Sequence, residues 1–112
     1  MKIKIATDFS RIPGARYPIE GDFSGQEFRK KILLPQLKEA INNHEELIID
    51  LDGTAGLGTS FLEESFGGLI REDHMRYKDI IKTLKFISTE EPDYIEEILS
   101  YINDAYEQEE HH

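Results

Sequence analysis

Residues 47–62 read Leu-Ile-Ile-Asp-Leu-Asp-Gly-Thr-Ala-Gly-Leu-Gly-Thr-Ser-Phe-Leu, and this stretch decides the fold. The apolar run 47–51 predicts a central strand of a sheet. The three glycines that follow predict a tight turn, and a helix that opens on Thr59 and Ser60 comes next. A strand, a glycine-rich turn and a helix in this order are typical of an α/β protein.

Length, charge and composition narrow the class of protein. The chain has 112 residues, so we expect one domain over 1–112, with 108–112 a flexible tail that ends in His111 and His112, possible remnants of a purification tag. The net charge is −10, which disfavours binding to nucleic acid. Nine Asp/Glu and no Lys or Arg lie between Glu90 and Glu110; they form either a solvated helix face or a docking surface for a basic partner.

Several functional classes are excluded by what the sequence lacks. The chain has no cysteine, which rules out disulfides, thiolate metal sites and cysteine nucleophiles. No apolar run approaches the roughly 18 residues of a membrane span, and no signal peptide opens the chain. We therefore expect a cytoplasmic protein with no membrane partner.

The other elements follow from the spacing of apolar residues. The alternation over 2–9 predicts a half-exposed strand, and 10–18 reads as a loop or a short irregular hairpin. The alternation over 83–88 predicts another strand, and a last helix follows Pro92. The expected order is strand-strand-helix-strand-helix-strand-helix. This order indicates an α/β fold in which helices pack on a small mixed β-sheet.

The first long helix has a clear beginning. Ser24 and Glu27 have the spacing of a capping box, and Phe23 and Phe28 stand at the positions of a hydrophobic staple. Pro35 lies inside the apolar stripe of this helix, where it removes one helix hydrogen bond. We expect the helix to kink or divide one residue before this proline.

The second helix repeats the capping pattern, because Ser60 and Glu63 have the same spacing. Glu63 and Glu64 are adjacent and should diverge on the helix, so we expect solvated charges rather than a carboxylate site. Gly67 and Gly68 weaken the middle of the helix and suggest close packing against another backbone.

Asp50-Leu51-Asp52-Gly53-Thr54 resembles the first motif of the haloacid-dehalogenase-like phosphohydrolases. The resemblance implies that Asp50 attacks phosphorus, that Asp52 serves as acid and base, and that magnesium screens the charge. Ser88 matches the later Ser/Thr motif of that family, but no later strand offers the acidic pair that would hold the metal. The alternative is that Asp52 and Gly53 make a turn.

The glycines of the loop also allow a phosphate-binding interpretation. Gly53, Gly56 and Gly58 lie between a strand and a helix, where backbone N–H groups can hold a phosphate. Their spacing is neither the dinucleotide fingerprint nor the P-loop, and no Lys-Ser/Thr pair follows. A tight crossover turn is the simpler interpretation.

The block from Leu47 to Leu69 resembles the signature of the sulfate-transporter and anti-sigma-factor-antagonist (STAS) domain, which has an apolar strand, Asp-Leu, a short loop and two hydroxyl residues at a helix start. Asp50-Leu51 and Thr59-Ser60 match it. The segments 23–28, 58–64 and 66–69 further resemble an uncharacterised STAS-like bacterial family. The resemblance implies phosphorylation at Ser60, or at Thr59, by an ATP-binding kinase-like regulator. Ser60 can instead be a simple N-cap.

The sequence thus favours a non-enzymatic protein–protein interaction module that needs no metal and no cofactor. Phosphorylation at a helix N-terminus is physically tolerable, because free N–H groups and the positive end of the helix dipole lie there. The runner-up is the magnesium-dependent phosphohydrolase that uses Asp50 and Asp52. We expect the partner-binding loop and helix start to comprise Gly53, Thr54, Gly56, Leu57, Gly58 and Phe61, together with the hydroxyl pair Thr59 and Ser60.

Overall fold

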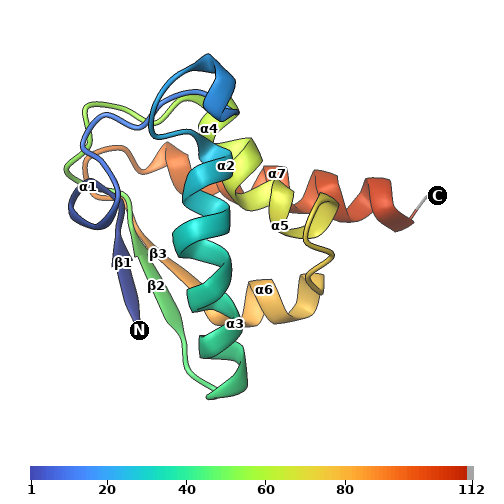
Figure 1. Ribbon diagram of the computed structural model, residues 1–112. Coiled ribbons are helices and arrows are strands. Elements are labelled where there is room, and N and C mark those ends of the chain that lie inside the picture. Colours follow the sequence, from blue (N-terminus) through green and yellow to red (C-terminus); the bar gives the residue numbers. More distant parts are fainter. Residues whose placement is uncertain (111–112) are drawn as a thin grey trace.

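The core of the protein is a sheet of three strands, which the computed structural model, described for residues 1–110, places in the order β1-β2-β3. The strands are β1 (Lys2–Lys4), β2 (Leu47–Asp50) and β3 (Leu84–Ile87). Both neighbouring pairs are parallel, with Ile49 opposite Ile3 on one side and opposite Phe86 on the other. All three strands therefore end at the same edge of the sheet (Figure 1).

Helical segments connect the strands and complete the described chain. They are α1 (Ile5–Asp8), η1 (Pro18–Glu20), α2 (Gly25–Phe28), η2 (Arg29–Leu33), α3 (Leu34–Asn42), α4 (Thr59–Leu62), η3 (Glu63–Gly67), α5 (Gly68–Arg71), α6 (Tyr77–Thr83) and α7 (Asp93–Glu110). Of these, η1 is a 3₁₀ turn, whereas η2 and η3 are π-helical turns. Residues 25–42 and 59–71 are helical without interruption, so each forms one long helix that contains a π turn.

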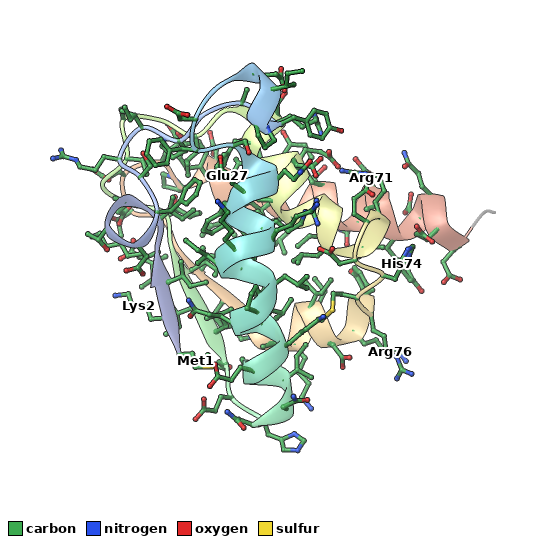
Figure 2. The ribbon with its side chains drawn as sticks, viewed as in Figure 1. Met1, Lys2, Glu27, Arg71, His74 and Arg76 are labelled. Atoms are coloured by element: carbon green, nitrogen blue, oxygen red, sulfur yellow. The ribbon has the colours of Figure 1, made fainter. Side chains whose placement is uncertain are left out.

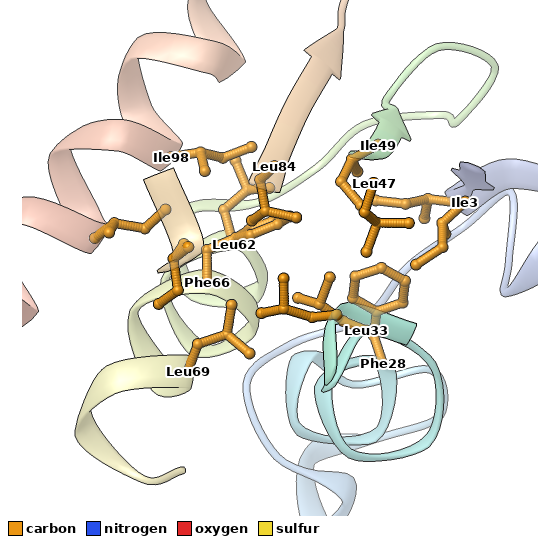
Figure 3. Close-up of a cluster of buried hydrophobic side chains, with 14 of the residues drawn as sticks. Ile3, Phe28, Leu33, Leu47, Ile49, Leu62, Phe66, Leu69, Leu84 and Ile98 are labelled. Carbon is orange, nitrogen blue, oxygen red and sulfur yellow. The ribbon is translucent and has the colours of Figure 1, made fainter. Parts of the chain in front are cut away.

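The long helices pack on one face of the sheet (Figure 1). On that face the buried side chains of Ile3, Leu47 and Ile49 meet Phe28 and Leu33 of the first long helix (Figure 3). The opposite face carries the row of Lys2, Ile48 and Lys85, whose side chains are exposed or half-buried. Parallel sheets are commonly covered on both faces. Here no segment among residues 1–110 covers the second face of the sheet completely.

The first long helix passes through Pro35 without a break. The N–H group of Leu34 donates to the carbonyl of Arg29, five residues earlier, which is the hydrogen bond of a π turn. The prediction of a kink or a division near Leu34 is thus replaced by a continuous helix with one wider turn before the proline. At its start, Ser24 Oγ accepts the N–H of Glu27 at 3.1 Å, which is the first of the two hydrogen bonds of the predicted capping box.

The second long helix contains a similar π turn, in which the N–H of Gly68 donates to the carbonyl of Glu63. The two glycines were expected to allow a backbone contact. A Cβ at Gly67 would collide with the Glu63 carboxylate, and a Cβ at Gly68 would lie 2.5 Å from Nε of Arg29. The glycines therefore make room mainly for two charged side chains, because Tyr101 O, the nearest backbone atom, would lie 3.4 Å from a Cβ at Gly67.

The α/β fold class is confirmed, although some elements differ from the expectation. The first strand ends at Lys4 instead of Phe9, because the chain turns into α1. Residues 10–18 form a loop and no second strand, since Pro13 and Pro18 lack the N–H groups of a ladder, and the described sheet is parallel instead of mixed. Helix α6 (Tyr77–Thr83) has no counterpart among the elements expected from the apolar spacing.

The C-terminal segment also differs from the expectation of a tail over 108–112. Residues 108–110 belong to α7, and His111 and His112 lie outside the described residues. Across residues 1–110, no helix has both the length and the apolar character of a membrane span.

Candidate functional site

Three loops meet at the edge of the sheet where the parallel strands end (Figure 1). The first connecting segment, residues 5–23, follows β1 and includes α1 and η1. The other two are residues 51–58 after β2 and residues 88–92 after β3. In open α/β sheets, ligands bind outside the carboxyl ends of the strands. The predicted contact loop and the hydroxyl pair both lie at this edge, which makes it the candidate functional site.

The glycine loop is held in place by its own backbone N–H groups. Three of them donate to neighbouring segments: Gly53 to the Glu90 carboxylate, Ala55 to the Arg11 carbonyl (2.7 Å) and Leu57 to the Tyr94 hydroxyl of α7 (3.1 Å). These donors are therefore engaged within the protein, which weakens the interpretation of the loop as a phosphate cradle. Gly53 has φ +94°, a conformation that a side chain would strain.

Asp50 ends β2 and is almost buried, with 6 % of its surface exposed. Its Oδ1 accepts the N–H of Asp52 at 3.0 Å, and its Oδ2 lies 3.7 Å from Nζ of Lys2 and 3.8 Å from Nζ of Lys4. The carboxylate thus organises the start of the turn and pairs with the lysines of the edge strand.

Asp52 binds the loop that follows β3. Its carboxylate accepts hydrogen bonds from the N–H of Thr89 (2.9 Å), the hydroxyl of Thr89 (2.5 Å) and the N–H of Glu90 (3.0 Å). The hydrogen bond from the Glu90 N–H, followed by that from the Thr89 hydroxyl, lowers the pKa of the Asp52 carboxyl. This arrangement fits the turn interpretation. Over residues 1–110, no three His, Asp or Glu side chains are grouped so that they could hold a metal ion.

Thr59 and Ser60 are the first two residues of α4, and both are exposed. Gly58 is the N-cap residue, and no side chain caps the helix. The prediction that Ser60 forms a capping box with Glu63 is therefore wrong, because the helix begins two residues too early for Ser60 to be its N-cap and Glu63 pairs with arginines. The hydroxyl of Ser60 is left without a structural role as a cap.

The apolar residues of the predicted contact loop point inward. Leu57 is 7 % exposed, and Phe61 is fully buried among the rings of Phe9 and Phe28, with centroid distances of 6.1 and 5.7 Å. Neither residue is available to a partner, which corrects that part of the prediction. The exposed residues of this stretch are Ala55, Gly56, Gly58, Thr59 and Ser60, and Gly53 and Thr54 are partly exposed.

A buried ion-pair network lies behind the hydroxyl pair, and the sequence did not indicate it. Arg29 and Glu64 are each 1 % exposed, and Nη2 of Arg29 donates to Oε2 of Glu64 at 2.7 Å. Arg29 also donates to the Glu64 carbonyl (3.1 Å) and to Oδ2 of Asp73 (2.7 Å). Burial alone would lower the pKa of Arg29, but the hydrogen bonds to Asp73 and Glu64 outweigh it, so the pKa is raised. The expectation that Glu64 is a solvated charge is wrong.

The network extends to Arg16 and Arg71, which both bind Glu63. Arg71 ends the second long helix (Figure 2). Nη1 of Arg71 donates to Oε2 of Glu63 at 2.6 Å, and Arg16 reaches Oε1 of Glu63 from the loop after β1. Burial alone would raise the pKa of the Glu63 carboxyl, but the hydrogen bonds from Arg71 and Arg16 outweigh it and lower the pKa. The pairs of Arg16 with Glu63 and Glu64 join the segment after β1 to the second long helix, on which Arg71 also lies.

Comparison with known proteins identifies the family of the chain. Searches of curated proteins and of solved structures find no match. A family model described as "STAS-like domain of unknown function (DUF4325)" matches residues 24–94, which include both long helices, the glycine loop and the hydroxyl pair. Because this match spans more than half of the chain, the protein belongs to this family of STAS-like domains.

Proposed function

We propose that the protein is a regulatory protein-binding module whose contact surface centres on Thr59, Ser60 and the exposed part of the loop before them. Membership of a STAS-like family suggests a regulatory or interaction role. The observation that carries the proposal is the pair of adjacent exposed hydroxyls that opens a long helix at the carboxyl edge of the sheet. Neither hydroxyl is used to cap the helix.

Phosphorylation of Ser60, or less readily of Thr59, switches the module in this proposal. A phosphate there would lie beside the N–H groups of the first helical turn, which have no side-chain acceptor, since Gly58 is the N-cap. Glu63 and Glu64 lie on the following turn, but their charges are paired with arginines. The repulsion that two free carboxylates would exert on a phosphate is thereby reduced.

The partner in this proposal is an ATP-binding kinase-like regulator that meets the protein in the cytoplasm. The partner supplies the nucleotide and the catalysis, and this protein supplies the hydroxyl and the surface around it. The module itself needs no cofactor and catalyses no reaction. A phosphate adds nearly two negative charges to an exposed helix end, which is enough to repel or recruit a partner.

The test compares the parent protein with Ser60→Ala and Ser60→Glu in pull-downs from a lysate of the source organism, with and without ATP. We expect an ATP-binding partner that is released by Ser60→Glu, and a phosphate on the peptide that contains Ser60 in the parent alone. Ser100→Glu is the matched control, because Ser100 is an exposed serine on α7. Capture that ignores ATP and both Ser60 variants would refute the switch.

A further inference from the structure

The loop between α1 and α2 exposes two large apolar side chains. Ile12 is 68 % exposed and Ile19 is 94 % exposed, more than any other large apolar residue in the described part of the chain. Tyr17 and Phe23 of the same loop are exposed as well. Large exposed apolar residues gathered in one loop mark an interaction site.

The loop is fixed in the conformation that exposes these residues. Arg16 is paired with Glu63, and the 3₁₀ turn around Ile19 is closed by the N–H of Gly21, which donates to the Pro18 carbonyl at 3.1 Å. Further hydrogen bonds join Gly14 N–H to the Phe23 carbonyl (2.8 Å), Gly25 N–H to the Ala15 carbonyl (2.8 Å) and Gln26 N–H to the Arg16 carbonyl (3.0 Å). A loop held this way cannot fold over its isoleucines, and its binding conformation costs little further ordering.

The loop borders the glycine loop on one side of the candidate site. The carbonyl of Arg11, the residue before Ile12, accepts the N–H of Ala55 at 2.7 Å. Gly25, at the start of α2, packs so closely on α4 that a Cβ there would lie 2.7 Å from the Phe61 carbonyl oxygen. The loop that carries the isoleucines therefore lies beside the glycine loop and the start of α4 (Figure 1).

Acidic side chains border the glycine loop on its other side. Glu90, Glu91 and Asp93 are exposed, and the hydrogen bonds from Gly53 and Leu57 to Glu90 and Tyr94 hold the start of α7 against the loop. The segment from Glu90 to Glu110 contains no Lys or Arg that would neutralise these charges from within α7. A partner with basic residues on this side would find complementary charge.

We propose that the partner is a folded protein with apolar pockets for Ile12 and Ile19 and with a lysine- or arginine-rich rim that faces the start of α7. The inference rests on the proposed function, because it describes the partner of that same contact surface. Apolar anchors surrounded by charged residues are the usual anatomy of a specific interface. The apolar anchors hold the complex, and the acidic side sets its orientation and its association rate.

A site-specific photo-crosslinker tests the apolar part. The probe is the full chain with p-benzoylphenylalanine in place of Ile12, Ile19 or, as a matched control, Ile81, an exposed isoleucine on α6. Each form is irradiated in a lysate of the source organism, and the adducts are identified by mass spectrometry. We expect positions 12 and 19 to capture the same protein, and position 81 not to capture it. Absence of an adduct at 12 and 19, equal capture at 81, or an adduct with a second copy of this chain would overturn the proposal.

Titration of the purified adduct partner tests both parts. We expect Ile19→Ser to lower the affinity at least about tenfold. The pair Glu91→Gln and Glu96→Gln should lower the affinity several-fold and flatten its salt dependence. Glu107→Gln with Glu109→Gln, two exposed glutamates at the far end of α7, is the matched control and should leave the affinity unchanged. Affinity that ignores Ile19→Ser or the salt concentration contradicts the proposal.

The same titration separates this inference from the phosphorylation switch. If the partner binds Ile19→Ser more weakly but binds equally with and without ATP and to Ser60→Glu, the docking surface is supported and the switch is refuted. A partner that is released by Ser60→Glu but binds Ile19→Ser like the parent keeps the switch and refutes the docking surface.

Discussion

Replacing Arg29 with methionine removes a buried guanidinium and keeps an unbranched side chain that retains the apolar stem. The guanidinium makes three hydrogen bonds, two to Glu64 and one to Asp73, and only 1 % of its side chain is exposed. In Arg29→Met, the buried Glu64 carboxylate loses its 2.7 Å partner and keeps only the longer contacts to Arg16 and Arg71, both at 3.3 Å. The variant therefore leaves a buried charge poorly compensated.

Breaking one half of a buried ion pair costs about 3–5 kcal/mol. We expect a loss at the lower end of this range, about 3 kcal/mol, for two reasons. Glu64 keeps its contacts to Arg16 and Arg71, and the Asp73 side chain is 14 % exposed, so water can reach its carboxylate. Domains of this size are stable by about 5–15 kcal/mol, so the loss is a large part of the total. The corresponding fall in melting temperature is roughly 12–24 °C.

Urea unfolding followed by circular dichroism measures this loss. Lys30→Met is the matched control, because Lys30 is the next residue of the same π turn and is exposed, and its free energy of unfolding should change by less than about 0.5 kcal/mol. The double variant Arg29→Met/Glu64→Leu removes both buried charges and should be more stable than Arg29→Met alone. A cost below about 1 kcal/mol for Arg29→Met, or a double variant whose cost equals the sum of the single costs, would refute the reasoning.

Four further predictions follow from individual residues. Gly68→Ala should destabilise the protein by about 1–3 kcal/mol in urea unfolding, although alanine favours helices, because its Cβ would lie 2.5 Å from Arg29 Nε. Ser24→Ala should cost about 1 kcal/mol, whereas Ser60→Ala should change stability by less than about 0.5 kcal/mol, because only the first serine caps a helix; equal costs would contradict this assignment. The pKa of the Glu63 carboxyl is lower in the folded protein than in the unfolded chain, so its contribution to stability is present above about pH 4.3 and is lost as the pH falls through the folded pKa. The difference in free energy of unfolding between the parent and Glu63→Gln should therefore narrow in urea titrations at acidic pH. A constant difference would argue against the ion pairs of Glu63 with Arg16 and Arg71. A magnesium-dependent phosphatase assay should detect no activity in the parent or in Asp50→Asn, and activity that only the parent shows would revive the phosphohydrolase interpretation.

Local patterns predicted the parts of the fold that depend on neighbouring residues. The strand at 47–50 and the helix after Thr59 follow from a short apolar run and a glycine-rich turn. The cap at Ser24 follows from a spacing of three residues, and all its partners lie within one turn. These interactions need no information from the rest of the chain.

The same local pattern failed at Ser60, because long-range partners decided the outcome. Glu63 has the spacing of a capping partner, but Arg16, which lies 47 residues away in the sequence, binds its carboxylate. Arg29 and Glu64 are 35 residues apart and meet only after both helices have packed. No spacing in a single sequence indicates such pairs, so the ion-pair network could not be found before the structure.

The inward direction of Leu57 and Phe61 was also hidden from the sequence. An apolar residue in a loop can serve as an anchor for a partner or as part of the core, and composition does not distinguish the two. The aromatic cluster around Phe61 includes Phe9, which directly follows α1, and Phe28 of the first long helix. Ile12 and Ile19 are instead exposed to solvent. The prolines and glycines around them predicted their loop but not this exposure.

The π turn in the first long helix has a consequence for how this chain should be aligned with its relatives. Phe28 and Leu33 are both fully buried although five positions separate them, a distance that would place them on different sides of a regular α-helix. The wider turn absorbs one residue and restores the phase of everything after it. A relative with one residue fewer between these two positions would keep the same buried face by closing the turn to an ordinary α-helical one. A single-residue gap in this helix is therefore a permitted change of length and not a misalignment, whereas a gap after Leu37 would rotate Ala40 out of the core.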